Sequence, residues 1–304
     1  MREAQASRTA QCMAFFRALE AARPASHRLF HDPLARAFLP GGLRLAAELA
    51  RAAPLGVLLR TYIDRRWPGA RTSAVARTRF LDDAAELAIR SGAEQAVVLG
   101  AGFDARAYRL AALDRVSVFE VDHPATSTAK RTAVAAALGV LPRHVRFVPI
   151  DFNAEPLGTA MASAGFDPGR RTLVIWEGVT NYLTEAAVDE TLRWCAGLAA
   201  GSRVLFTYVH RQVLDAPQTF AGTARLFAAL HAADERWTFG LEPAEVPGFL
   251  ARRGLSLDED VGAAAYRARY FGQAAAGMCG YEFYRIASAH VPGPVPHAAQ
   301  PGVA

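Results

Sequence analysis

One stretch of this chain constrains its fold more than any other: an apolar run that ends in glycines, followed by a second apolar run that ends in acids. The first is AVVLGAGFDARAYRL at residues 96–110, and the second is VFEVDHP at residues 118–124. Glycines at a strand end let a ligand approach the backbone, and an acid after the next strand can hold ribose hydroxyls. The pair predicts a nucleoside site.

Strand and helix patterns alternate on both sides of this segment. The predicted strands are 96–100, 116–121, 145–150, 172–177, 203–209, 255–260 and 281–288, and the predicted helices are 104–112, 125–138, 184–199 and 244–253. Such alternation implies right-handed crossovers and a mostly parallel sheet whose ligand lies beyond the carboxyl ends of its strands. The predicted fold class is therefore α/β, a doubly wound, Rossmann-like sheet of seven strands.

The chain divides into three predicted parts. Residues 1–92 are Ala-rich segments punctuated by prolines, which predicts an N-terminal helical cap. Residues 93–290 form the nucleoside-binding domain, and the aromatic-bearing stretch 210–244 is a helical insertion after the fifth strand that would act as a lid. Residues 291–304 are rich in proline and glycine and are predicted to be disordered.

Composition limits the class of protein. With 304 residues, 52% of them hydrophobic, the chain can bury a large core. It has no apolar run long enough to span a membrane and no hydrophobic signal core, so we expect neither a membrane partner nor export. Its cysteines, Cys12, Cys195 and Cys279, are widely spaced and odd in number, which favours reduced thiols in a cytoplasm and no metal site.

The formal charge of +5 does not indicate nucleic-acid binding. Lys130 is the one lysine among 34 basic residues, and the arginines are scattered rather than gathered with aromatics. A nucleic-acid footprint should cluster, so no nucleic-acid partner is predicted. The chain is expected to be a monomer or a homodimer.

The glycine pattern distinguishes between two cofactors. The third glycine of the dinucleotide motif G-x-G-x-x-G is missing, because Ala105 and Arg106 occupy that region. The pattern therefore favours S-adenosyl-L-methionine (SAM), which has no pyrophosphate to cradle, over NAD.

Six blocks of sequence, in order, resemble the leucine carboxyl methyltransferase family, in its bacterial branch of SAM-dependent O-methyltransferases. The resemblance extends from about Ser7 to about Ile286, and implies the class I methyltransferase fold and a SAM cofactor. The blocks are SRTAQCMAFFRALE (7–20), RLFHDPLARAFL (28–39), VARTRFLDDA (75–84), LGAGFDARAYRL (99–110), FEVDHP (119–124) and IWEGVTNYLTEAAV (175–188).

The first cofactor residues follow the first two strands. Gly100 and Gly102 would bring backbone amides close to the methionine part of SAM, although a plain strand-to-helix turn also needs such glycines. Glu120 and Asp122 point to one face by strand alternation, so one can hold the ribose and the other serve structure. The resemblance favours Asp122 for the ribose.

Later blocks supply the other cofactor residues. Asp151 and Phe152 follow the third strand, and the resemblance assigns them to the adenine. Glu177 ends a very apolar strand, so it needs a cationic partner, and the resemblance places it at the methionine end of SAM. Arg77 matches the family arginine that holds the SAM carboxylate, and Arg17 is a second candidate.

Two residues are candidates for the chemistry. Tyr182 would face the methyl group and the acceptor, or else pack at the N-terminus of the following helix. His210, just beyond the fifth strand, is the predicted general base if the acceptor is a hydroxyl, whereas a carboxylate acceptor needs none.

The predicted function is SAM-dependent O-methylation of a hydroxyl or carboxyl group on a small molecule, for instance a secondary metabolite. Two alternatives remain open. One is a SAM-binding protein that does not methylate, and the other is an NAD-dependent oxidoreductase.

Overall fold

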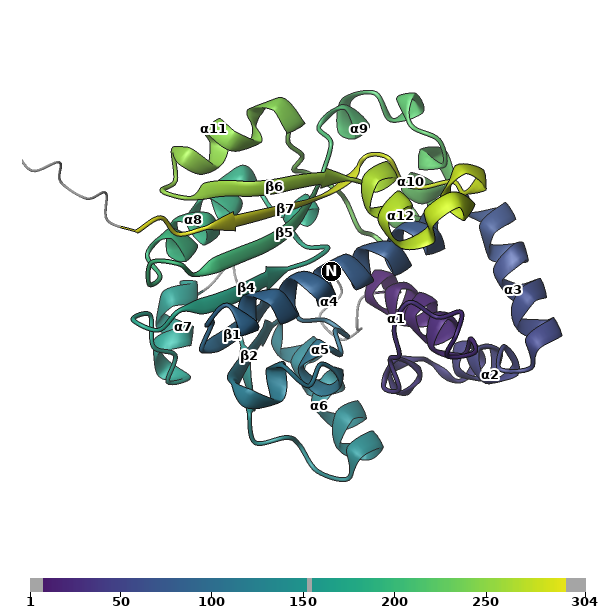
Figure 1. Ribbon diagram of the computed structural model, residues 1–304, viewed down its shortest axis with the longest axis horizontal. Helices are drawn as coiled ribbons and strands as arrows, with labels where there is room; N and C mark the ends of the chain where they lie inside the picture. The colour runs from purple at the N-terminus through teal and green to yellow at the C-terminus, as the bar shows by residue number, and fades with distance from the viewer. Residues whose placement is uncertain (1–7, 152–154, 294–304) are drawn as a thin grey trace, which may run out of the picture.

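The computed structural model describes residues 8–151 and 155–293. Within these residues the centre of the molecule is one seven-stranded sheet in the order β3-β2-β1-β4-β5-β7-β6 (Figure 1). β7 is antiparallel to both of its neighbours, while β1 to β5 are parallel. The strands are β1 (Gln95–Leu99), β2 (Ser117–Asp122), β3 (Val145–Pro149), β4 (Thr172–Trp176), β5 (Arg203–Val209), β6 (Ser256–Gly262) and β7 (Tyr284–His290).

The strand order reverses between β1 and β4, and this reversal positions the site. β1 pairs with β2 on one side and with β4 on the other, so the connections after β1 and β4 leave in opposite directions. A crevice opens beyond the carboxyl ends at such a reversal, and ligands of doubly wound sheets bind there. The predicted fold class is confirmed.

Helices cover both faces of the sheet. One face packs against α7, α8 and α11, and the other against α4 and α12, with α4 crossing the near face in Figure 1. The helices are α1 (Arg8–Ala21), α2 (Gly41–Leu49), α3 (Ala53–Arg66), α4 (Ala70–Arg90), α5 (Arg106–Arg109), α6 (Pro124–Leu138), α7 (Leu157–Ser163), α8 (Glu185–Ala196), α9 (Gln212–Asp215), α10 (Thr223–Ala232), α11 (Val246–Ala251) and α12 (Ala263–Phe271).

The N-terminal helices form a cap at the carboxyl edge of the parallel strands. Helices α1 to α3 gather at that end of the molecule in Figure 1, and α1 packs against α4. The ring of Phe38 stacks on Phe103, which follows β1, with centroids 5.0 Å apart. This stacking and the buried side chains Phe15 and Leu19 join the cap to the glycine turn.

The insertion after β5 is helical, as predicted. It carries α9 and α10 and is anchored by an aromatic cluster in which Trp237 and Phe220 pack against Phe283, just before β7. Thr184 starts α8 by accepting a hydrogen bond from the backbone N–H of Ala187 at 3.2 Å. Ser, Thr, Asp and Asn are preferred at this position because their oxygens satisfy an otherwise unpaired amide.

Three details of the prediction are corrected. The helix expected at 104–112 is the short α5, because Ala105 before it is not helical and Leu110 after it is extended. Helices α7 and α12 were not predicted; α7 is only seven residues long. The last strand is β7 at 284–290 rather than 281–288, and it lies between β5 and β6. The predicted tail falls mostly outside the described residues.

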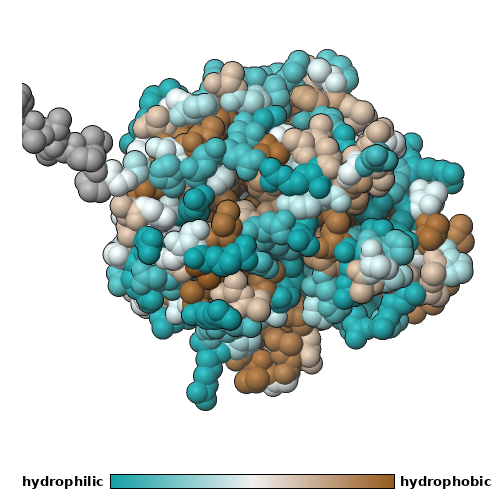
Figure 2. Space-filling view, viewed as in Figure 1, coloured by the Kyte–Doolittle hydropathy of each residue, from teal (hydrophilic) through white to brown (hydrophobic). Residues whose placement is uncertain are grey.

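The surface is mixed polar and apolar over the face seen in Figure 2. Exposed large apolar side chains concentrate on the cap helices α2 and α3, namely Leu45, Leu49, Leu55, Val57, Leu58 and Tyr62. In the part of the chain that the structure describes, no helix has the length and apolar character needed to cross a membrane.

Candidate active site

A cavity of about 430 Å³ lies beyond the carboxyl ends of β1, β2 and β4. Its walls come from four parts of the chain: the strand ends, α1 of the cap, α4, and the insertion after β5. Segments far apart in sequence therefore meet around one space at the reversal of strand order. The site predicted from the glycine and acid runs is this cavity.

The turn after β1 gives a ligand access to the backbone. Gly100 has φ +62°, and a Cβ placed there would lie 2.3 Å from Cγ2 of Val179. Gly102 has φ +43°, but a Cβ there would meet nothing closer than 3.7 Å. Both glycines line the cavity, and at Gly100 no other residue fits without displacing Val179.

The acid at the end of β2 is held by backbone amides. The Asp122 carboxylate lines the cavity and accepts hydrogen bonds from the backbone N–H groups of Gly102 and His123. Burial raises the pKa of Asp122, although these amides and Lys130 oppose the shift. The bonds fix the carboxylate against the glycine turn, where it can accept hydrogen bonds from a diol.

Glu120 does not reach the cavity. Its buried carboxylate pairs with Lys130 of α6 at 2.9 Å and accepts a hydrogen bond from Tyr108 at 2.8 Å. It faces the same way as Asp122, but it lies two residues, or roughly 6.6 Å, further from the strand end. The prediction of Glu120 as a cofactor residue is therefore corrected to a structural role, one of the two alternatives left open for it.

The acid at the end of β4 has the cationic partner that the sequence required. Oε1 of Glu177 accepts from Nε of Arg77 at 2.7 Å, and Oε2 accepts from Nη1 of Arg106 at 2.8 Å. Burial would raise the pKa of Glu177, but the two guanidinium groups outweigh it and leave this pKa lowered. Glu177 therefore stays ionised.

Arg77 lies on α4, as predicted, and its side chain is held on two sides. Besides Glu177, its guanidinium carbon lies 4.4 Å from the ring centroid of Tyr284. Arg17 also lines the cavity; its Nε donates to Asp32 at 2.8 Å and its Nη2 to the carbonyl oxygen of Phe103. Both predicted arginines are thus at the cavity wall.

Part of the cavity wall is aromatic. Tyr182, in the 3₁₀ turn η3 (Thr180–Tyr182), packs edge to face on Trp237 of the insertion with centroids 6.4 Å apart. Its hydroxyl donates to Glu235 at 3.2 Å. Asp151 also lines the cavity and is exposed, whereas Phe152 lies outside the described residues.

The wall charge favours a cationic ligand. Among the described residues, five carboxylates and two guanidinium groups line the cavity: Asp104, Asp122, Asp151, Glu177 and Glu235 against Arg17 and Arg77. Arg106 lies behind the wall and pairs with Asp104 and Glu177, so five carboxylates stand against three guanidinium groups. SAM carries a sulfonium and an ammonium against one carboxylate, and fits this surplus of acid. A pyrophosphate is negatively charged and does not fit it.

Sequence comparison identifies the family. The model of the leucine carboxyl methyltransferase family matches residues 10–196, which is more than half of the chain. The chain belongs to this family. The family predicted from the six sequence blocks is therefore confirmed, and with it the SAM cofactor named for the relatives below.

Several relatives of this methyltransferase are known. A protein of Frankia alni, named as an S-adenosyl-L-methionine-dependent methyltransferase, is 38% identical over 210 residues, covering 68% of this chain and 70% of the relative. One from Streptomyces avermitilis with the same kind of name is 35% identical over 258 residues, covering 82% and 83%.

Solved structures share the fold. A DUF574 family protein from Streptomyces avermitilis aligns over 94% of this chain and 98% of its own, with a TM-score of 0.57 and 16% identity. A protein from Thermobifida fusca titled as a methyltransferase aligns over 79% and 89%, with a TM-score of 0.55 and 18% identity. At this identity the likeness is one of fold alone.

His210 lies outside the cavity of this methyltransferase. Its Nδ1 accepts from the backbone N–H of Gln212 at 3.2 Å and lies 3.5 Å from Glu242, and its ring packs on Phe220. The backbone N–H of His210 donates to the carbonyl oxygen of Phe283, so pairing with the segment before β7 continues beyond the end of β5. His210 is therefore not among the described residues that line the cavity, and the structure does not bring the predicted base to it.

The sequence did not reveal the charged network behind the cavity. Arg106 is buried and donates to Asp82 at 2.8 Å, to Asp104 and to Glu177. Asp104 also accepts from the backbone N–H of Arg106, the first residue of α5, at 2.7 Å. Asp104 and Arg106 stand in the glycine block of the sequence. Asp82, the partner of Arg106, belongs to α4, and only the fold brings it near.

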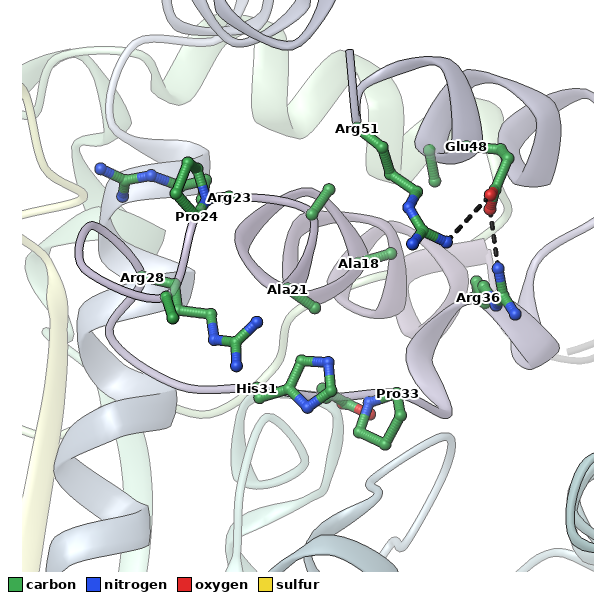
Figure 3. Close-up of a pocket in the computed structure, with 14 residues that line it drawn as sticks. Ala18, Ala21, Arg23, Pro24, Arg28, His31, Pro33, Arg36, Glu48 and Arg51 are labelled. Carbon is green, nitrogen blue, oxygen red and sulfur yellow. Dashed lines mark hydrogen bonds and ion pairs between the residues drawn. The ribbon is translucent and has the colours of Figure 1, made fainter. Parts of the chain in front are cut away.

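A second hollow of about 360 Å³ lies within the cap, between α1 and α2 (Figure 3). Arg28 lies beside His31 at one end, and Arg36 and Arg51 bind Glu48 at the other. No strand end contributes to its wall. It is therefore separate from the cofactor cavity, and in the described part of the chain no cluster of side chains could hold a metal ion.

Proposed function

We propose that this methyltransferase transfers the methyl group of SAM to an oxygen atom of a small molecule, such as a secondary metabolite, held in the strand-end cavity. The observation that carries the proposal is that two chemically different sets of residues line one cavity. Fixed charges lie at the ends of β2 and β4, and aromatic side chains lie between η3 and the insertion.

The strand-end residues suit the parts of SAM one by one. Asp122 is placed to accept hydrogen bonds from the ribose diol, and Asp151 to accept one from the adenine amino group. Glu177 suits the ammonium of the methionine part, while Arg77 beside it suits the carboxylate. Gly100 lines the cavity without a side chain, because a Cβ there would collide with Val179.

When bound, SAM supplies a methyl group activated by the positive sulfur. The chain's own contribution is alignment, because an in-line displacement needs the acceptor oxygen on the axis through the methyl carbon and the sulfur. The carboxylates are placed to hold the cofactor. The cap and the insertion contribute to the wall and limit the water that reaches the acceptor.

The dinucleotide alternative meets a local obstacle. A pyrophosphate binds where a helix begins after the first strand. In this chain Asp104 stands at that place, and its own carboxylate accepts the backbone N–H of Arg106. A negative side chain occupies the position that a phosphate would need, which argues against an NAD-dependent oxidoreductase.

The proposal is tested by following the methyl group. Purified protein is incubated with SAM carrying a trideuterated methyl group and a small-molecule extract of its host cells, and the products are analysed by mass spectrometry. We expect one extracted compound to gain a single labelled methyl on oxygen, and heat-denatured protein to give none. A protein that binds SAM but labels no compound would support the non-methylating alternative.

A further inference from the structure

Helix α3 leaves most of its apolar side chains exposed. Of its 14 residues, only Gly56 and Ile63 are buried. Leu58 is 65% exposed, Tyr62 60% and Leu55 47%. A helix that packs on a protein core buries its apolar stripe, but most of this stripe is not covered by the described residues.

The exposed side chains follow the periodicity of a helix. Leu55, Leu58 and Tyr62 have the i, i+3, i+7 spacing that places residues on one side. Leu45 and Leu49 of α2 are four residues apart and are 61% and 52% exposed. We call these five residues the cap face. In Figure 1, α3 lies at the outer edge of the molecule, and Figure 2 shows apolar residues at the same edge.

The cap face is separate from the cofactor cavity. Among the described residues, no part of α2 or α3 contributes to the cavity wall. A partner that covers the cap face therefore does not compete with the cofactor for these residues.

Exposed arginines border the cap face. Arg44 precedes Leu45 in α2, and Arg65 and Arg66 end α3 about one turn beyond Tyr62. All three arginines are exposed, and none of them forms an ion pair with a described residue. Arg44 donates instead to two backbone carbonyl oxygens. The positive charges of these arginines are therefore not neutralised.

The acids near the cap face do not cancel these charges, because each acid is paired with another arginine. Glu48 binds Arg36 at 2.7 Å and Arg51 at 3.0 Å. Asp64 accepts two hydrogen bonds from the guanidinium group of Arg71. The border of the cap face thus has an excess of positive charge.

This charge distinguishes between two kinds of partner. In a symmetric dimer the cap face would meet the same face of a second copy, and the arginines of both copies would repel one another. The surface of an anionic bilayer attracts arginines and also takes up exposed leucines. Tyr62 and Trp67, whose ring centroid lies 5.0 Å from the guanidinium carbon of Arg66, are of the residue types enriched where a bilayer meets water.

We propose that the cap face binds the surface of an anionic lipid bilayer. The leucines and Tyr62 enter the boundary between headgroups and acyl chains, and Arg44, Arg65 and Arg66 contact lipid phosphates. The sequence predicted no membrane partner because it has no membrane-spanning run. The proposal departs from that prediction, since a helix that lies on a bilayer needs no such run.

Flotation with lipid vesicles tests the proposal. Purified protein is mixed with vesicles of phosphatidylcholine alone or of phosphatidylcholine with phosphatidylglycerol, and the fraction that floats with the lipid is measured. Leu58→Gln removes an apolar side chain from the cap face. Arg65→Gln combined with Arg66→Gln removes two charges from its border. Both leucine and glutamine are good helix formers, so α3 should persist, which circular dichroism checks.

Matched control variants change the same residue types at the opposite edge of the sheet. Leu87→Gln alters a leucine that is 52% exposed in the last two turns of α4, before β1 begins. Arg115→Gln combined with Arg252→Gln removes two exposed charges just before β2 and β6. The second control has the same net charge as the double arginine variant of the cap face.

We expect the wild type to bind anionic vesicles at least about tenfold more strongly than neutral ones, because each arginine near the surface adds to the attraction. The double variant of Arg65 and Arg66 should lower binding to anionic vesicles about tenfold or more. Leu58→Gln should lower it about fivefold, through the loss of buried apolar surface. The controls should stay within about twofold of the wild type, and added salt should weaken binding.

Three results would overturn the proposal: a wild type that does not float with anionic vesicles, equal binding to both kinds of vesicle, or cap-face variants that bind like the wild type. Light scattering without lipid examines the other partner. A wild-type dimer that Leu58→Gln converts to a monomer, together with no vesicle binding, would assign the cap face to a second copy of the chain instead.

Discussion

Gly100 and Gly102 are close in sequence and both have positive φ, yet the structure places different demands on them. A Cβ at Gly100 would collide with Val179 at 2.3 Å, while one at Gly102 would have its nearest neighbours at 3.7 Å. We predict that Gly100→Ala lowers the free energy of unfolding by about 2–4 kcal/mol, the sum of backbone strain and overpacking. Gly102→Ala adds only the backbone strain and should lower the free energy of unfolding by about 1 kcal/mol.

Urea denaturation followed by circular dichroism measures both variants. Calorimetry with S-adenosylhomocysteine should show the larger loss of affinity in Gly100→Ala as well, because Val179 and Gly100 both line the cavity. Equal losses of stability in the two variants would mean that Val179 moves aside freely. The contact between Val179 and Gly100 would then not require a glycine.

The positions of individual residues could be predicted where the residues directly follow a strand. Asp122 and Glu177 each follow an apolar strand, and parallel strands bring their carboxyl ends to one edge, so their meeting in the cavity followed from the pattern. Glu120 and His210 do not line the cavity: alternation gives the face of a strand but not the distance of Glu120 from its end, and His210 follows the end of β5. Glu235 was missed because its position depends on how the insertion folds back over the sheet.

Among the structural elements, α5 and the end of β4 depend on one buried charge network. Burial would raise the pKa of Asp104, but Arg106, Lys130 and Arg17 outweigh it and hold this pKa well below its usual range. The unfolded chain therefore takes up a proton on Asp104 at a higher pH than the folded chain does. The stabilisation is present above about pH 4 and is lost as the pH falls toward the lowered value.

We predict that Asp104→Asn makes the free energy of unfolding depend less on pH between about pH 5 and pH 3, since this proton uptake no longer exists. The variant should also be less stable than the wild type near neutrality, because Arg106 loses one of its partners. Urea denaturation at several pH values measures both effects, with the exposed Asp114→Asn as control. A slope identical to that of the wild type would show that Asp104 does not stabilise the fold through its charge.

Elements with a strong local pattern were predicted with small shifts of their ends, as for β5 and α6. Two helices, α7 and α12, escaped the prediction. Helix α7 is seven residues long, and an isolated helix of this length is not stable, so its local pattern is weak. Helix α12 packs along α4, a partner that the sequence order does not reveal.

Across the whole molecule, the cap and the sheet are connected at the cofactor cavity. Arg17 of α1 bonds to Asp32 within the cap and to the carbonyl oxygen of Phe103 after β1. Thr9 of the same helix bonds to Glu235 of the insertion. A cofactor in the cavity would therefore contact both the cap and the insertion and hold them together.

Hydrogen exchange tests this connection. Saturating S-adenosylhomocysteine should slow amide exchange in α1 and in residues 235–241, besides the strand ends, because these segments line or adjoin the cavity. Amide exchange in α2 and α3 should not change, since neither helix contributes to the cavity wall. Protection confined to the strand ends would show that the cap and the insertion open independently of the cofactor.

The central claim is that the strand-end cavity holds SAM and not a dinucleotide, and titration calorimetry tests it most directly. Purified protein is titrated in turn with SAM, S-adenosylhomocysteine and NAD. We predict saturable heat with the first two and none with NAD, because the wall has more carboxylates than guanidinium groups and Asp104 occupies the place of a phosphate. Saturable heat with NAD, and none with SAM or S-adenosylhomocysteine, would contradict the account.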